Sequence, residues 1–303
     1  MLSSVRNICV IGLGSMGMGA AQSCIRAGLN TWGVDLNPAA LETLRQAGAR
    51  DAQNSARTFA QELDAVLLLV VNAAQVKAIL FGDNGLAAML KPGTVVMVSS
   101  TISAQDAQQI EQQLAQHQLL MLDAPVSGGA ARAASGEMTV MASGSDEVFT
   151  LLQPVLDAVA AKVYRVGSEI GLGSTVKIIH QLLAGVHIAV GAEAMALAAR
   201  AGIPLDTMYD VVTNAAGNSW MFENRMRHVV DGDYSAKSAV DIFVKDLNLV
   251  AETAKSLHFP LPLASTALNM FTEASNAGYG REDDSAVIKI FSGITLPQAQ
   301  EKA

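Results

Sequence analysis

Short apolar segments alternate with helical patterns along the first half of the chain, and this alternation constrains the fold more than any other feature. Five runs rich in β-branched residues predict strands: Val5–Ile11, Thr31–Asp35, Ala65–Val71, Thr94–Val98 and Leu119–Asp123. Several of these runs are apolar without alternation, which is typical of parallel strands that are covered on both faces. Helical patterns such as Ala39–Ala47 and Ala104–Gln116 fill the gaps. The sequence therefore predicts a doubly wound α/β domain.

The second half of the chain has a different pattern. A further strand pair is predicted at Glu137–Ala142 and Lys162–Val166, with a helix between them. After Gly173 only helices are predicted: Ser174–Ala201, Pro204–Asn214, Ser238–Leu257 and Leu261–Ala277. We place the boundary in the glycine-containing segment that follows Val166. The prediction is an α/β domain over residues 1–167 and an all-helical C-terminal domain over residues 168–303, which begins with a long interdomain helix.

Composition excludes several classes of protein. The net charge of −8 argues against a nucleic-acid partner, which would need a basic face. Cys9 and Cys24 lie in apolar runs, so no disulfide framework or cysteine metal site is predicted. The apolar segment Leu182–Ala201 carries Glu193 and Arg200, which favours a buried helix over a membrane span. The N-terminus shows no secretory signal pattern. We therefore expect a cytoplasmic protein with no membrane partner.

A glycine-rich turn directly follows the first predicted strand and opens a helix. Its residues are Gly12, Leu13, Gly14, Ser15, Met16 and Gly17. In such a turn the glycines permit a tight bend, a close approach of a pyrophosphate to the backbone, and close packing of helix on strand. Asp35 ends the second strand, where a carboxylate accepts hydrogen bonds from ribose hydroxyls. The alternative role for Asp35 is to cap the helix that begins at Pro38. We predict a Rossmann-type domain that binds NAD rather than NADP, because no Arg stands at positions 36 and 37.

Two further strand ends are expected to line the dinucleotide crevice. One carries Val70, followed by Asn72 and Gln75, and the other carries the Ser99–Thr101 segment. The alternative for these polar residues is ordinary loop chemistry, with hydroxyls that cap the helix starting near Ala104. We favour that alternative for Ser99 and Ser100.

A Ser-Gly-Gly segment, Ser127, Gly128 and Gly129, follows the strand that ends at Asp123. Adjacent glycines expose several backbone N–H groups, and such a nest can hold a small carboxylate. A flexible glycine hairpin is an equally good interpretation of the residues alone.

The predicted interdomain helix is apolar almost all round, and we expect it to be buried. Within it, Ser174, Lys177, His180 and Gln181 share one narrow stripe. A lysine is rarely buried without a partner, so Lys177 is a candidate acid–base group. A structural salt bridge to a carboxylate of the first domain is the alternative. His180 is given a supporting role, and no metal site is predicted because His180 and His187 have no third ligand in pattern.

Lys245 and Asp246 lie on a later helix whose core stripe contains Phe243, Leu247, Val250, Ala254 and Leu257. From the residues alone, the face that carries Lys245 and Asp246 is expected to be solvated. The aromatic cluster Asn218–Phe222 is expected to pack between helices or subunits rather than cover a cleft.

These motifs together resemble those of the β-hydroxyacid dehydrogenases, the 3-hydroxyisobutyrate dehydrogenase-like family. Four signatures occur in order over nearly the whole chain: Gly12–Gly17, Asp123–Gly129, Gly171–Lys177 and Lys245–Leu247. The resemblance implies that Lys177 is the catalytic acid–base residue and that Ser127, Gly128 and Gly129 bind the substrate carboxylate. It also implies that Thr101 and Lys245 contact the cofactor, which reverses the solvated interpretation of Lys245. Gln181 stands where much of the family has Asn beside the substrate.

The resemblance implies hydride transfer between a hydroxyl-bearing carbon of a small hydroxy acid and NAD, with Lys177 moving the hydroxyl proton. Alternatives are a dehydrogenase of another short hydroxy acid or semialdehyde, a decarboxylating 6-phosphogluconate-type enzyme, an imine reductase and a non-catalytic NAD-binding protein. The apolar helix Leu182–Ala201 and the helical domain around it predict a homo-oligomer through that domain.

Overall fold

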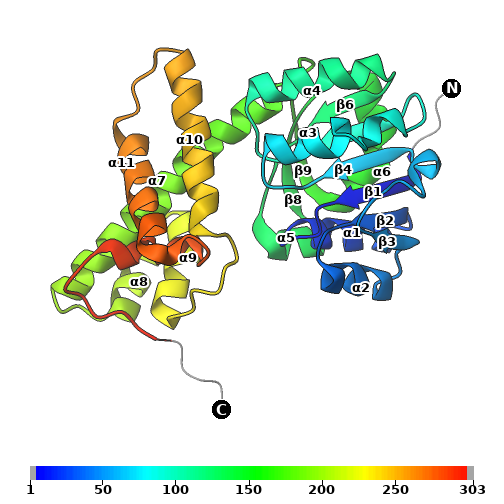
Figure 1. Ribbon diagram of the computed structural model, residues 1–303. Helices are drawn as coiled ribbons and strands as arrows, with labels where there is room; N and C mark the ends of the chain where they lie inside the picture. Colours follow the sequence, from blue (N-terminus) through cyan, green and yellow to red (C-terminus); the bar gives the residue numbers. More distant parts are fainter. Residues whose placement is uncertain (1–4, 299–303) are drawn as a thin grey trace. The chain divides into compact units, whose positions relative to one another are not determined.

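The computed structural model describes residues 5–298 (Figure 1). The chain divides into two compact units, residues 1–177 and residues 178–303. The first unit is an α/β domain and the second is helical, so the predicted fold class is confirmed. Helix α7 (Leu172–Arg200) begins in the first unit and continues into the second.

One sheet forms the centre of the first unit. Its strands are β1 (Asn7–Ile11), β2 (Asn30–Val34), β3 (Asp51–Gln53), β4 (Ala65–Leu68), β5 (Val95–Val98), β6 (Leu120–Asp123), β7 (Val126–Ser127), β8 (Met138–Ser143) and β9 (Ala160–Gly167). The order is β3-β2-β1-β4-β5-β6-β8-β7, and β9 pairs with β8. Strands β3 to β6 are mutually parallel along this path. Strand β8 runs antiparallel to β6 and β7 and parallel to β9.

Helices cover both faces of the sheet and explain the strands without alternation. They are α1 (Gly17–Arg26), α2 (Pro38–Gln46), α3 (Ala73–Phe81), α4 (Ala104–Gln116), α5 (Gly129–Ser135) and α6 (Asp146–Val159), with short 3-10 turns η1 (Ala60–Glu62) and η2 (Leu86–Ala88). On one face, Val10 of β1 joins a core with α1 and α6. On the other face, Cys9 of the same strand joins a core with α3 and α4. Both sides of β1 are therefore apolar.

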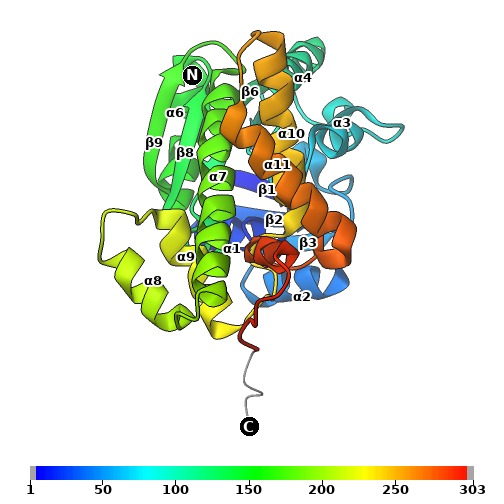
Figure 2. The ribbon, with the colours of Figure 1, turned by 90° about the vertical axis from the view of Figure 1, so that its left-hand side faces the viewer.

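The helical unit contains most of α7 and four further helices. These are α8 (Leu205–Thr213), α9 (Trp220–Asp231), α10 (Val240–Ser256) and α11 (Pro262–Ala274), followed by the turns η3 (Ser275–Tyr279) and η4 (Asp284–Ile290). Helices α10 and α11 lie side by side in both views (Figures 1 and 2), and the stacked rings of Phe243 and Phe271, with centroids 5.2 Å apart, join them. Between 178 and 298 the structure places no strand, as predicted, apart from a single bridge between Ala239 and Asp283.

Two expectations about helix burial are wrong. Helix α7 is buried on one side only, because its apolar face is wider than the surface that the rest of the chain offers it. Ile178 is 2% exposed, whereas Ile179 is 55% and Leu197 is 69% exposed. Leu257, expected in the core stripe of α10, is 69% exposed because it stands at the C-cap, where the helix ends.

Helix α7 is also long and apolar enough to cross a membrane by length and composition, with half of its most apolar window buried inside the structure. The aromatic cluster forms the start of α9, which Ser219 caps. Phe222 is buried and stacks on Tyr209 of α8, in agreement with a packing role between helices, whereas Trp220 is exposed.

Candidate functional site

The glycine-rich loop between β1 and α1 has the backbone that its glycines require. Gly12 has a φ of +90°, and a Cβ there would lie 2.6 Å from the carbonyl oxygen of Leu69. A Cβ on Gly17 would lie 1.7 Å from the carbonyl oxygen of Gly12. A Cβ on Gly14, in contrast, would meet no atom within 4 Å. Gly12 and Gly17 are therefore needed by the fold itself, whereas bare backbone at Gly14 leaves the loop open to a ligand.

Asp35 lies beside this loop, at the end of β2. One carboxylate oxygen, Oδ2, accepts a hydrogen bond of 2.6 Å from the backbone N–H of Leu13, and Oδ1 accepts one of 2.8 Å from Asn37. The cap of α2 is Asn37, whose side chain accepts from the backbone N–H of Ala39. The interpretation of Asp35 as the helix cap is therefore wrong. Its half-buried carboxylate keeps lone pairs for further donors such as ribose hydroxyls.

The polar residues after β4 serve mainly to start a helix. Asn72 caps α3 by accepting from the backbone N–H of Gln75, and the Gln75 side chain accepts from the backbone N–H of Val71. This is a reciprocal capping arrangement of the kind that satisfies the unpaired donors of a helix start. It supports the loop-chemistry interpretation for Asn72 and Gln75. Val70 is half-buried at the strand end.

The serines after β5 bind neighbouring strand ends. The Ser99 hydroxyl donates to the carbonyl of Ala124 at 2.7 Å, and the Ser100 hydroxyl accepts from the backbone N–H of Val70 at 3.1 Å. The structural role that we favoured is confirmed, but the expected capping role falls to Ser103, which caps α4. Thr101, which follows Ser100, is half-buried.

The Ser-Gly-Gly segment is part of ordered secondary structure. Ser127 belongs to β7 and pairs with Thr139 of β8. Gly128 has a φ of +136° and stands at the N-cap of α5, and Gly129 begins that helix with a φ of +71°. The interpretation as a flexible hairpin is therefore wrong. A Cβ on Gly129 would meet no atom within 4 Å, so open backbone faces solvent at this helix start.

Lys177 lies in the second turn of α7, close after the helix start at Leu172. Lys177 is 7% exposed, and Ser174, one turn earlier, is 1% exposed. The expected burial of this lysine is thus present. Ser174 and the preceding Gly171 bind Asp123, the last residue of β6, whose side chain is completely buried. The sequence motif Asp123–Gly129 includes Asp123, but no role was predicted for this residue.

A second buried carboxylate, Asp246 of α10, binds two predicted site residues. Its Oδ2 accepts from the Gln181 amide nitrogen at 2.6 Å, and its Oδ1 lies 2.6 Å from the Lys245 ammonium. His180 Nδ1 lies 3.0 Å from the Gln181 amide oxygen. Asp246 is 2% exposed, so the expected solvated face is wrong. Helical periodicity could not reveal this, because the contact joins residues 65 positions apart.

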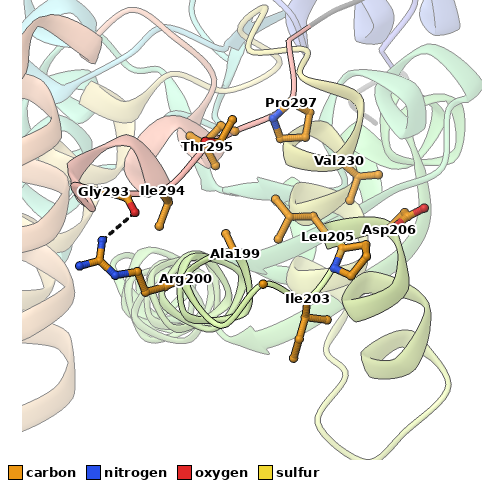
Figure 3. A pocket seen from close by; sticks show the side chains of 13 residues that line it. Ala199, Arg200, Ile203, Leu205, Asp206, Val230, Gly293, Ile294, Thr295 and Pro297 are labelled. Carbon is orange, nitrogen blue, oxygen red and sulfur yellow. Dashed lines mark hydrogen bonds between the residues drawn. The ribbon is translucent and has the colours of Figure 1, made fainter.

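Two other features lie outside this set of residues. Among residues 5–298, no group of three or more His, Cys, Asp and Glu side chains is arranged to hold a metal ion. A cavity of about 740 Å³ opens in the helical unit, near the end of α7 (Figure 3). There Arg200 donates to the carbonyl of Gly293 at 2.6 Å. The residues that line the cavity include no predicted site residue.

Comparison with known families divides the chain at almost the same place as the fold. Residues 7–167 match the NAD binding domain of 6-phosphogluconate dehydrogenase. Residues 171–291 match a domain described as the NAD-binding domain of NADP-dependent 3-hydroxyisobutyrate dehydrogenase.

Individual relatives match over nearly their full length. The chain is 79% identical to L-threonate dehydrogenase of Pectobacterium atrosepticum, over 97% of both chains. It is 77% identical to L-threonate dehydrogenase of Escherichia coli K12, over 96% of both chains. A crystal structure described as 3-hydroxyisobutyrate dehydrogenase from Salmonella typhimurium is 72% identical, covers 94% of this chain and 99% of its own, and superposes with a TM-score of 0.91. The names of these similar proteins specify two different hydroxy acids.

Proposed function

We propose that this chain, which belongs to the 3-hydroxyisobutyrate dehydrogenase-like family, oxidises L-threonate with NAD as the hydride acceptor. The main structural support for this proposal is Lys177. This lysine is buried on a helix whose first turn is hydrogen-bonded to the end of a strand of the sheet. Its support among relatives is the set of L-threonate dehydrogenases that are 57–79% identical over nearly the full length. Oxidation at C2 of L-threonate yields a 2-oxo acid.

The residues of the glycine-rich loop fit the cofactor. Gly12 and Gly17 shape the turn, and Gly14 leaves room for a pyrophosphate beside the start of α1. Asp35 would accept from a ribose hydroxyl and repel a 2′-phosphate, which favours NAD over NADP. Leu13, Ser15, Met16, Val70, Thr101 and Lys245 complete the proposed set of cofactor contacts. When bound, NAD supplies the hydride acceptor of the reaction.

The chain's own residues then bind the acid and move one proton. Ser127 and the backbone N–H groups of Gly128 and Gly129 would hold the substrate carboxylate, since helix-start N–H groups bind anions. Lys177, as the neutral amine, would take the proton of the hydroxyl group while the hydride leaves the same carbon. In the reverse direction the ammonium would return that proton. Gln181, which Asp246 orients, would present its amide to the substrate.

The substrate is tested by an assay of NADH absorbance on a panel of acids. We expect L-threonate to give the highest kcat/KM. The competing substrates are 3-hydroxyisobutyrate, assayed with NAD, and tartronate semialdehyde, assayed with NADH. The first is included because the crystal structure described above is named for it. A preference for either would overturn the proposed substrate and keep the reaction type. Loss of carbon dioxide from the product would identify the decarboxylating alternative, and imine reduction alone would identify an imine reductase. NAD binding without any turnover would identify a non-catalytic protein.

We also propose that the protein is cytoplasmic and forms a homo-oligomer through its helical unit. Leu183, Val190 and Leu197 recur every seven residues on α7, and each is 53% or more exposed. Such an apolar stripe is a surface that a second copy would cover. Light scattering at micromolar concentration should show at least a dimer for the wild type, and a smaller species for Leu183→Glu, which places a charge in the stripe. A wild-type monomer would contradict this proposal. The domain boundary at residues 167 and 168 stays a prediction.

A further inference from the structure

Asp123 holds the start of helix α7 with both of its carboxylate oxygens. Oδ2 accepts from the backbone N–H of Gly171 at 3.0 Å and of Ser174 at 2.9 Å, and Oδ1 accepts from the Ser174 hydroxyl at 2.7 Å. Two of these donors are backbone N–H groups at the helix start, which have no partner inside a helix. A single buried carboxylate on the end of β6 therefore accepts the hydrogen bonds of donors at the start of α7 that have no partner within the helix.

A second contact, from the neighbouring strand β8, holds the same turn in place. Ser143, at the end of β8, accepts from the backbone N–H of Gly173 at 3.0 Å, and its hydroxyl lies 3.4 Å from Asp123 Oδ2. Gly173 cannot carry a side chain here, because a Cβ would lie 2.6 Å from the Asp123 carbonyl oxygen and 2.7 Å from that of Met141. The helix start is thus pressed against two strand ends with no space for a side chain between them.

The Asp123 carboxylate links two parts of the proposed site. Ser174 precedes Lys177 by three residues, so both lie on the same face of α7. Asp123 precedes Ser127 by four residues, with Ala124–Val126 between them. The carboxylate is therefore close along the chain to the substrate-binding segment, and it directly fixes the turn that leads into the lysine.

We propose that Asp123 is the positioning residue of the reaction, which holds the first turn of α7 so that Lys177 stands in a fixed place relative to Ser127, Gly128 and Gly129. This rests on the proposed role of Lys177. Asp123 itself touches neither substrate nor cofactor in this account. A displacement of a reacting group by about 1 Å lowers a rate by as much as about 100-fold, so the rigidity of this turn matters to turnover.

The electrostatic surroundings agree with an acceptor role. Burial raises the pKa of Asp123, and the hydrogen bonds from Ser174, Gly171 and Ser143 offset part of that rise. The donors that surround the carboxylate are neutral amides and hydroxyls. An amide side chain can accept some of these bonds but turns its own N–H donors toward the others. Asp123→Asn is therefore a variant of equal size that disturbs the turn.

The experiment compares Asp123→Asn with a matched control, Asp64→Asn. The Asp64 carboxylate also accepts two backbone N–H bonds, from Arg6 and Asn7, but it precedes β4 at the opposite end of the strands. We expect Asp123→Asn to lower kcat about 10- to 100-fold, with NAD affinity and the KM of the acid little changed. Asp64→Asn should lower the melting temperature and leave kcat at the wild-type value.

Both variants are then measured in the Lys177→Ala background. If Asp123 acts through Lys177, Asp123→Asn should lower the residual turnover by less than about threefold there, because residues that act as a unit are not additive. An equal loss in both backgrounds, or a kcat of Asp123→Asn within about twofold of wild type, would overturn the proposal. Undiminished turnover of Lys177→Ala alone would instead overturn the proposed function. Should Asp123→Asn not fold, Ser174→Ala removes one of the same bonds and is judged by the same criteria.

Discussion

Asp123 in the α/β unit and Asp246 in the helical unit are both buried carboxylates next to predicted site residues, but they have different partners. Asp123 accepts from two backbone N–H groups and a hydroxyl. Asp246 pairs with the Lys245 ammonium and accepts from the Gln181 amide. The first carboxylate completes a helix start, and the second neutralises a cation and orients an amide. Burial alone therefore does not tell what an aspartate does.

The strand ends explain the contacts of Asp123. The ends of β6 and β8 meet at the Asp123–Ser143 pair and β9 ends beside Ser143, so α7 starts where a carboxylate on a strand end can reach its unpaired backbone N–H groups. Asp35 does the same for the glycine-rich loop through Leu13. In the helical unit, Asp284 lies 2.7 Å from the Arg225 guanidinium. Asp283 has partners of a mixed kind, because it contacts His228 at 2.9 Å and also accepts from the backbone N–H of Lys237.

The largest change in stability is expected for Asp246→Ala. Removal of this carboxylate takes an ion-pair partner from Lys245 and a hydrogen-bond acceptor from Gln181, and breaking a buried ion pair costs about 3–5 kcal/mol. Urea unfolding should show this loss of unfolding free energy. Lys237→Ala, which breaks the exposed Lys237–Asp233 pair of 3.2 Å, is the control and should lose less than about 1 kcal/mol. Equal losses for the two variants would show that Asp246 contributes no more than a surface charge.

A smaller, pH-dependent effect is expected for Asp283→Asn. Burial would raise the pKa of Asp283, but hydrogen bonds from His228, Ser285 and the backbone N–H of Lys237 outweigh it and lower the pKa to about 2. A lowered pKa stabilises the folded state above the unfolded value of 3.8, and this contribution is lost as the pH falls toward 2. Asp283→Asn should therefore be less stable than wild type by about 2 kcal/mol at pH 7.

The difference in unfolding free energy between the wild type and Asp283→Asn should shrink as the pH is lowered from about 4 to about 2, the range between the unfolded and folded pKa values. Thermal unfolding across that range, at fixed ionic strength, gives the measurement. A difference that stays constant from neutral pH down to the folded pKa would mean that the ionisation of Asp283 contributes nothing to stability.

The smallest effect is expected at Asp35, which is half-buried beside the glycine-rich loop. Asp35→Ala removes both an acceptor for the ribose and a charge that repels a 2′-phosphate. The preference of kcat/KM for NAD over NADP should narrow by about tenfold, which corresponds to about 1.4 kcal/mol. Steady-state kinetics with both cofactors measures this ratio, with Glu42→Ala on the exposed face of α2 as the control. A wild-type enzyme that uses both cofactors equally would show that Asp35 does not select NAD.

The fold was largely predictable from the sequence because its strands are buried on both faces. All seven predicted strands overlap strands of the structure, namely β1, β2, β4, β5, β6, β8 and β9. The strands β3 and β7 were missed because runs of three and two residues carry no periodicity. Helix α5 was missed because Gly129 at its start resembles a turn, although the Ala-rich residues that follow favour a helix.

The candidate site was less predictable, since its key contacts join distant parts of the chain. The burial of Lys177 followed from the apolar helix around it. The contact between Ser174 and Asp123 joins residues 51 positions apart, and no local pattern indicates it. The exposed apolar face of α7 was missed for a related reason. Periodicity shows which residues are apolar but does not show how much surface the rest of the chain offers to cover them.

Turnover and NAD affinity, measured on folded Lys177→Ala, distinguish a catalytic role of this lysine from a structural one. We expect unchanged NAD affinity, because Lys177 is not one of the proposed cofactor contacts, and turnover lower by about 10²- to 10⁴-fold. Lys177→Arg should not restore activity, because a guanidinium does not release its proton near neutral pH. Turnover near the wild-type value would contradict the account and move the proton transfer to another group. Loss of NAD binding in a folded protein would show that Lys177 has a structural role.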